Sequence, residues 1–177
     1  MRNTAEQCVQ EVLDQLYDEM LLRVQDPLCE LPSWIAGKEK AARDLDAIAR
    51  RAGIDPTQLP PLSAQDESEI TRSVFRSCVQ SAVVAVVRGM LDDVDRSTGV
   101  RTYDADAISA LTRSCIEDPT WMQQHGVELD IAQVLTAAMA PTLLASPALH
   151  AGAPLVRDSK EYRWVSDGTL LTISSVP

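Results

Sequence analysis

The sequence predicts a mainly α-helical domain that ends in a short β-hairpin. Of its 177 residues, 45% are hydrophobic but only 4% are aromatic and seven are glycine, which favours helices packed by aliphatic side chains. Apolar residues recur at three- and four-residue steps over most of the chain and alternate only near its C-terminal end. We expect an orthogonal or irregular bundle of five to six helices around a long central helix at about 64–95. Residues 1–177 would form a single domain, with a hairpin at about 161–175 inside an appendage at 160–177.

The first predicted helix follows a cap at Asn3 or Thr4 and ends at Pro27. Its apolar positions have helical spacing: Val9, Val12, Leu13, Leu16, Met20 and Val24. Acidic residues occupy the remaining positions: Glu11, Asp14, Asp18 and Glu19. We expect this helix to bury its apolar face and to turn an acidic face outward.

The second predicted helix is capped by Ser33, runs to about Ala52 and is closed by Gly53 in a left-handed conformation. Its predicted core stripe consists of Ala41, Leu45, Ile48 and Ala52. A proline-rich connector at 54–62 then separates it from the third helix.

The third predicted helix is the longest and the most apolar. Ser63 with Asp66 opens it, and two adjacent four-residue stripes run along it from Ile70 to Val94. Residues 82–87 are apolar on every side of the helix. A helix of this kind needs neighbours on most of its faces, so we expect it to be the core of the fold.

Three shorter helices are predicted after a polar loop at 92–102. Their N-caps are Asp104, Asp118 and Asp130, and Gly126 stops the second of them. Beyond them the chain is broken into short turns by three prolines: Pro141, Pro147 and Pro154.

The hairpin is predicted from two short alternating runs around residues 166–169, where Asp-Gly is a strong turn signal. Pairing across this turn places Tyr162 opposite Ile173 and Trp164 opposite Leu171 on one face. A two-stranded ribbon is marginal in water, so this face must lie on its own helices, on a second copy or on a partner protein. These four residues are therefore candidate partner contacts, and the free edges of the ribbon could extend a partner's sheet.

The formal charge of −10 limits the choice of partners. It disfavours unaided binding to nucleic acid and to anionic membranes, since both need positive charge. The chain has no run of about 18 uninterrupted apolar residues, and its N-terminus lacks the basic-then-apolar pattern of a signal peptide. We expect a cytoplasmic protein whose cysteines are reduced, apolar core residues: Cys8, Cys29, Cys78 and Cys115.

Residues 45–62 resemble the first half of a bacterial helix-turn-helix. The resemblance rests on an alanine that faces the turn, a glycine in the turn and two apolar residues at core spacing: Ala49, Gly53, Ile54 and Leu59. Pro60 and Pro61 would interrupt the helix that enters the major groove, and no basic residue follows the turn before Arg72. A dimeric, transcription-associated protein that uses residues 41–62 is the alternative function.

Residues 93–104 are similar to a calcium loop of the EF-hand kind. The matching oxygen-bearing residues are Asp93, Asp95, Ser97 and Asp104. The turn glycine comes one residue late and the closing residue is aspartate rather than glutamate, so a polar loop between helices explains the same residues. His125 and His150 lack ligands at helical spacing, and nucleophile, phosphate-loop and dinucleotide motifs are missing. We predict no catalytic residue, no cofactor site and no metal site.

The sequence therefore favours a non-enzymatic, acidic protein-binding module of the inhibitor, immunity, chaperone or adaptor type. Its expected partner is a protein of basic character, and a homodimer is an open alternative. The candidate partner contacts are Tyr162, Trp164, Leu171, Ile173, Glu11, Asp14 and Asp18. A cleft between helices that combined His125 or a cysteine with carboxylates would indicate an enzyme instead.

Overall fold

The computed structural model describes residues 4–177, with side chains from Glu6 onward, and it confirms a mainly helical fold with a C-terminal sheet. The helices are α1 (Thr4–Cys29), α2 (Pro32–Arg51), α3 (Ala64–Arg96), α4 (Ala105–Ile116), α5 (Pro119–His125), α6 (Leu129–Ala145), α7 (Pro147–His150) and the 3-10 helix η1 (Pro56–Gln58). The strands are β1 (Val100–Tyr103), β2 (Ala153–Arg157), β3 (Lys160–Ser166) and β4 (Leu171–Ser175). The cap predicted at Asn3 or Thr4 lies outside the residues whose side chains are described.

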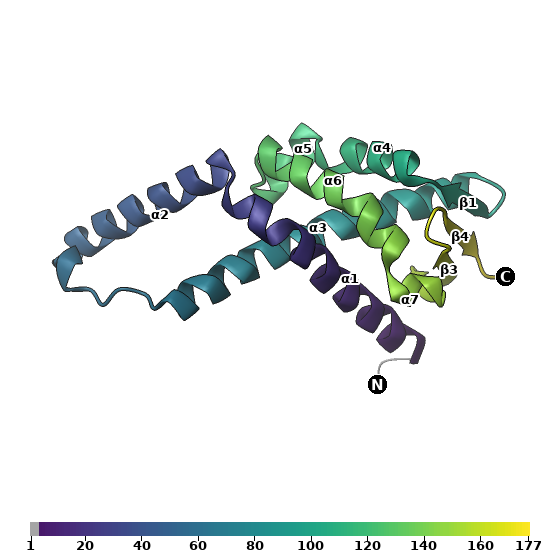
Figure 1. Ribbon diagram of the computed structural model, residues 1–177, viewed down its shortest axis with the longest axis horizontal. Coiled ribbons are helices and arrows are strands. Elements are labelled where there is room, and N and C mark those ends of the chain that lie inside the picture. The colour runs from purple at the N-terminus through teal and green to yellow at the C-terminus, as the bar shows by residue number, and fades with distance from the viewer. Residues whose placement is uncertain (1–3) are drawn as a thin grey trace.

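α3 is the central helix, as predicted, and Ser63 caps it by accepting a hydrogen bond from the Asp66 backbone N–H at 3.0 Å. Its C-terminal part, from Phe75 to Val94, is buried against α1, α4 and the sheet. Figure 1 shows that α1 crosses α3 and that α6 lies alongside these two helices. By length and composition alone α3 could cross a membrane, and so could α5 and α6 taken together across their 104° bend. In this fold the apolar residues of α3 form the protein core.

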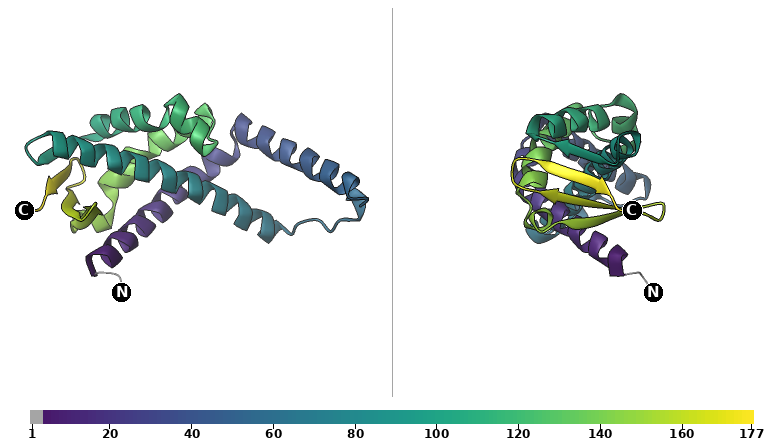
Figure 2. Two further views of the ribbon diagram at one scale, coloured as in Figure 1. Left: turned by 180° about the vertical axis from the view of Figure 1, so that it is seen from behind. Right: turned by 90° about the vertical axis from the view of Figure 1, so that its right-hand side faces the viewer.

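The four strands form one antiparallel sheet in the order β1-β4-β3-β2. Its side chains alternate, so that one face is buried and the other is open to water. The buried face consists of Tyr103, Ala153, Leu155, Tyr162, Trp164, Leu171 and Ile173. Figure 2 shows the strands gathered at one end of the molecule, where they pack against α1, α3 and α7.

The predicted hairpin forms, but with its register moved by two residues. Trp164 lies opposite Ile173 and Ser166 lies opposite Leu171. The loop is therefore 167–170, and it is held by the Asp167 carboxylate, which accepts hydrogen bonds at 2.8 Å from two backbone N–H groups further along the loop. A shift of two residues leaves each side chain on its original face, so the prediction of the apolar face is confirmed.

Strands β1 and β2 were not predicted. They occupy segments expected to be a polar loop and a series of turns, and they pair with β4 and β3 on the two sides of the hairpin. The expectation that the ribbon has free edges is therefore wrong, because both edges are filled within the chain. Each added strand has only four or five residues, which is too short for a clear alternating pattern.

The predicted helix ends are correct at several caps and wrong at others. Asp104 and Asp118 cap α4 and α5 as predicted. Ser33 and Asp130 were expected to cap α2 and α6, but Leu31 and Glu128 take these cap positions. The reason is that Ser33 donates hydrogen bonds to the Asp130 carboxylate. The first helix also continues past its proline, which lies in the last turn and removes only one helical hydrogen bond.

α2 and the first part of α3 leave the body of the protein together, and we refer to residues 32–78 as the arm. Figure 1 shows the two helices diverging from the body, joined at the tip by η1 and the proline-rich connector. Gly53 ends α2 with a φ of 77°, as predicted, and the Asp55 carboxylate accepts a hydrogen bond from the Thr57 N–H at 3.0 Å. The tip is therefore an ordered turn that holds the two helices apart.

Candidate protein-binding site

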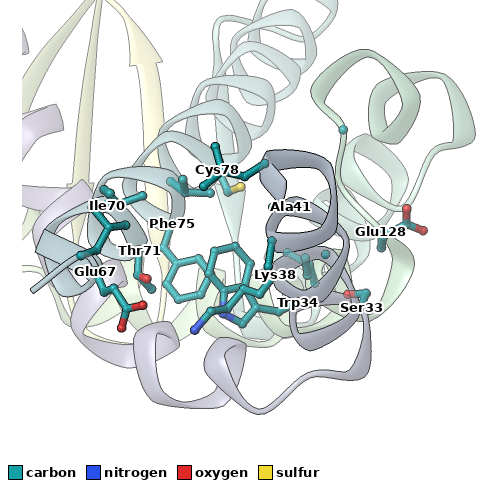
Figure 3. A pocket seen from close by; sticks show the side chains of 17 residues that line it. Ser33, Trp34, Lys38, Ala41, Glu67, Ile70, Thr71, Phe75, Cys78 and Glu128 are labelled. Carbon is teal, nitrogen blue, oxygen red and sulfur yellow. The ribbon is translucent and has the colours of Figure 1, made fainter. Parts of the chain in front are cut away.

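An open groove of about 620 Å³ lies between the two helices of the arm (Figure 3). One wall comes from α2: Trp34, Gly37, Lys38, Ala41, Ala42 and Leu45. The other wall comes from α3: Glu67, Ile70, Thr71, Val74, Phe75 and Cys78. Within each wall the residues recur at three- and four-residue steps, so each wall is one continuous helical face. Residues from the start of α6 and the turn before it close the root of the groove.

Two contacts anchor the root of the arm. The rings of Trp34 and Phe75 lie with their centroids 4.5 Å apart and their planes tilted by 53°. The Ser33 backbone N–H donates a hydrogen bond to the Asp130 carboxylate at 3.2 Å, and the Ser33 hydroxyl bonds to the same carboxylate. Desolvation opposes ionisation of Asp130, but these hydrogen bonds outweigh it and lower the pKa of that carboxyl. α2 is thus fastened to α3 and α6 at its first turn.

Beyond the root, the walls of the groove are open to water. Of the thirteen large apolar side chains that are exposed among the described residues, seven belong to the arm: Ile35, Leu45, Ile48, Ile54, Leu62, Ile70 and Val74. Leu45 and Ile48 are 57% and 59% exposed, although they belong to the stripe that the sequence predicted to be core. That prediction is wrong for α2, because no element of the chain covers this face. Four of the seven line the groove: Leu45, Leu62, Ile70 and Val74. An exposed apolar groove of this kind is typical of a protein interaction site.

The groove combines one cysteine with two carboxylates, Cys78 with Glu67 and Glu128, and this is the combination named above as an indication of an enzyme. Cys78 lies at its floor, where burial raises the pKa of the thiol, so the less nucleophilic protonated form dominates at neutral pH. Lys38 and Glu67 stand on opposite walls near the mouth (Figure 3). His125 does not line this groove. Its ring stacks on Trp121, with centroids 4.7 Å apart, beside a separate hollow of about 480 Å³.

The residues that are similar to a calcium loop have protein partners instead. Asp95 lies within α3 and accepts hydrogen bonds from three groups: the Lys160 ammonium, the Tyr162 hydroxyl and the Arg157 guanidinium, each at 2.7 Å. These bonds, above all the one from Lys160, lower the pKa of Asp95 to about 2. Asp93 accepts a hydrogen bond from the Tyr103 hydroxyl at 3.1 Å, and Asp104 caps α4. Among the described residues, no group of three or more His, Cys, Asp or Glu side chains could hold a metal ion.

The apolar hairpin face lies inside the protein. Its four candidate contacts are at most 1% exposed: Tyr162, Trp164, Leu171 and Ile173. They pack beneath the chain's own helices, which was one of the three places open to this face. The candidate binding surface therefore lies elsewhere on this fold.

The predicted acidic contacts lie together on α1, but two of them already have a partner. Asp14 and Asp18 face Arg76 of α3, at 3.5 Å and 3.3 Å. Glu11 is exposed. The same guanidinium lies over the Tyr17 ring, 5.6 Å from its centroid. This cluster fixes the crossing of α1 and α3 just behind the groove.

The segment that resembles a helix-turn-helix lacks its second helix. After Gly53 the chain forms only the three-residue η1 and an extended connector up to Ser63. The prolines at 60 and 61 lie in that connector, where they prevent the helix that would enter a major groove. Arg50 and Arg51 lie at the tip of the arm instead.

The groove was missed because the sequence cannot tell a stripe that is buried within the chain from one left open. The one signal was the connector with three prolines, which is too stiff and extended to let two helices close tightly. Comparison with models of known protein families, with curated proteins and with solved structures finds no significant match.

Proposed function

We propose that this protein is a non-enzymatic protein-binding module that holds an amphipathic helix of a protein partner between α2 and α3. The observation that carries the proposal is the pair of apolar helical faces turned toward an open groove. Helix-in-groove recognition uses this arrangement, since the apolar face of one helix completes the packing of its hosts. Such a module suits an inhibitor, an immunity protein, a chaperone or an adaptor.

The lining of the groove supports a helix as its occupant. The α2 wall has only small side chains at its centre: Gly37, Ala41 and Ala42. A Cβ atom added at Gly37 would meet no other atom within 4 Å. Large residues flank this stretch, with Trp34 at the root and Leu45 toward the tip. A partner helix could therefore lie close to α2 while its own large side chains pack between the two walls.

The apolar area supports a stable complex. Burying one Leu or Ile side chain completely contributes about 1.5–3 kcal/mol, and several such side chains line or flank the groove. Part of this gain is offset by the entropy lost on association, and that loss is smaller for a preformed site. The anchored root and the capped tip keep the groove preformed.

Photo-crosslinking in the native host tests this proposal. A benzophenone amino acid at Val74, on the α3 wall, should give a discrete protein adduct, and Ile70→Asp in the same chain should reduce its yield strongly. The crosslinked peptide should carry apolar residues at three- and four-residue steps. The matched control is the same amino acid at Arg72, which is exposed on α3 but does not line the groove. Equal adduct yields from the two positions would refute the proposal.

A further inference from the structure

We infer that the hollow between α3 and α5 is a second binding site, and that its ligand is a small organic anion containing a flat ring. The hollow has a volume of about 480 Å³, which is within the range of pockets for small molecules. Six of the nine described residues that line it come from one face of α3, at three- and four-residue steps, and the other three come from α5. It shares no lining residue with the groove of the arm, so the inference goes beyond the proposed function.

The lining of this hollow carries positive charge and no negative charge. Arg88 belongs to the lining, whereas none of the nine described lining residues is Asp or Glu. Over the whole chain, acidic side chains outnumber Lys and Arg by 26 to 16. Salt screens charges that lie more than about 8 Å away, so the local lining decides which ligand charge the hollow attracts.

The Arg88 guanidinium is available to a ligand. Arg88 is exposed and has no ion-pair partner among the described residues. The carboxylate one turn further along α3 belongs to Asp92, which pairs with Arg157 at 2.6 Å. A guanidinium binds carboxylate and phosphate groups through two parallel N–H groups, so an unpaired one in the lining of a pocket favours an anionic ligand.

The two glutamines of the hollow are also available. Gln80 and Gln124 line it without a side-chain hydrogen bond to any described residue. By contrast, Gln10, Gln15 and Gln65 each donate to a carboxylate four positions further along their helices. An amide side chain both donates and accepts hydrogen bonds, so these two suit the polar edge of a ligand ring.

The remaining lining suits a flat ring. The rings of Trp121 and His125 lie with their centroids 4.7 Å apart and their planes tilted by 34°, and both residues line the hollow. Val84 and Ala85 of α3 are half-buried and add apolar surface. Aromatic side chains offer a surface on which another ring stacks. An anion with a ring therefore uses both this surface and Arg88, whereas an anion without a ring uses only Arg88.

An NMR titration of the full chain tests the inference, because its three tryptophans give three indole N–H signals. The probes are 4-hydroxybenzoate, which has a carboxylate, and adenosine monophosphate, which has a phosphate. At least one probe should bind with a Kd below about 1 mM and shift the signal of Trp121, assigned with Trp121→Phe. The signals of Trp34 and Trp164 should not move. The probe that binds more tightly identifies the anionic group that the site prefers.

Analogues and variants separate the contribution of the charge from that of the ring. The uncharged 4-hydroxybenzyl alcohol and adenosine, and the ringless acetate and inorganic phosphate, should each bind at least about tenfold more weakly than the matching probe. Arg88→Gln should weaken binding of the anionic probe by about tenfold and leave binding of its uncharged analogue unchanged. Arg72→Gln, on the same helix but outside the hollow, is the matched control and should bind as the wild type does. Both arginines are exposed, so both variants should fold.

Three outcomes would overturn the inference. Neither probe binds with a Kd below about 1 mM, or Arg88→Gln binds the anionic probe as tightly as the wild type, or the probe shifts the signal of Trp34 instead of Trp121. None of these outcomes bears on the proposed function, because the crosslinking test at Val74 uses a different set of residues.

Discussion

Trp34 of α2 packs against Phe75 of α3 with ring centroids 4.5 Å apart, at the point where the two walls of the groove meet. Phe75 is only 1% exposed and belongs to the protein core, whereas Trp34 is half-buried at the start of the arm. The pair therefore joins a well-packed body to a helix that has little other support. Its loss should affect both the stability of the body and the position of α2.

Phe75→Ala should lower the free energy of unfolding by about 3–5 kcal/mol, because it leaves a cavity at a fully buried position. It should also increase amide hydrogen exchange along α2, which would lose its aromatic contact at the root. Urea denaturation measures the first effect and exchange mass spectrometry the second. Phe75→Leu is the control, with an expected cost of about 1 kcal/mol. Equal costs for the two variants would contradict this account of the contact.

Asp130→Ala should destabilise the protein by about 1–2 kcal/mol, since it removes the hydrogen bonds that Asp130 accepts from Ser33. The effect should be concentrated in α2, and exchange of its first-turn amides should measure it. Ser33→Ala should produce the same pattern. Adding Ser33→Ala to Asp130→Ala should cost little more, because the hydroxyl has already lost its acceptor, whereas Ser33→Ala alone keeps the bond from the Ser33 backbone N–H. Strictly additive costs would mean that the two residues do not stabilise the arm through each other.

Trp164→Ala should cost about 3–5 kcal/mol in unfolding free energy, because this side chain is completely buried in the sheet face. Trp164→Phe should cost much less. The indole Nε1 has no hydrogen-bond partner among the described residues, so this substitution breaks no hydrogen bond and only reduces the volume of the side chain. Val165→Ala, on the open face of the same strand, should change stability by at most about 0.5 kcal/mol. A folded, fully stable Trp164→Ala variant that lost a partner would instead place this residue in an interface.

The sequence predicted those elements whose signals are local. Ser63, Asp104 and Asp118 cap their helices as expected, because an N-cap needs only the backbone of its own first turn. The apolar face of the hairpin was also correct, since alternation decides it whatever the register. The register itself was wrong by two residues because the Asp167 side chain stabilises a loop at 167–170, one residue further along than the predicted loop at 166–169.

The sequence could not predict features that depend on which elements meet. β1 and β2 exist because a hairpin lies beside them, and their few residues carry no pattern of their own. The stripe containing Leu45 and Ile48 is typical of a core helix, yet the connector directs α2 away from the body and leaves the stripe open. The candidate site was therefore missed although the residues of its two helical walls had been assigned to the right helices.

The stability of the sheet against α3 should fall in acid through Asp95. The hydrogen bond from Lys160 is the main cause that lowers the pKa of Asp95 from an ordinary value of 3.8 to about 2, with the Tyr162 hydroxyl next. A carboxyl whose pKa is lower in the folded state stabilises the fold above the unfolded value, and this contribution is lost as the pH falls through the folded value. The loss should therefore occur between about pH 4 and pH 2.

Urea midpoints of the wild-type chain and of Asp95→Asn measure this effect. The wild type should be the more stable of the two near neutral pH, and the difference should shrink as the pH approaches about 2, where the wild-type carboxyl is itself neutral. Glu39→Gln, an exposed carboxylate change in α2, is the control and should differ little from the wild type at any pH. A difference between wild type and Asp95→Asn that is as large at pH 2 as at neutral pH would show that the substitution acts through packing rather than through charge.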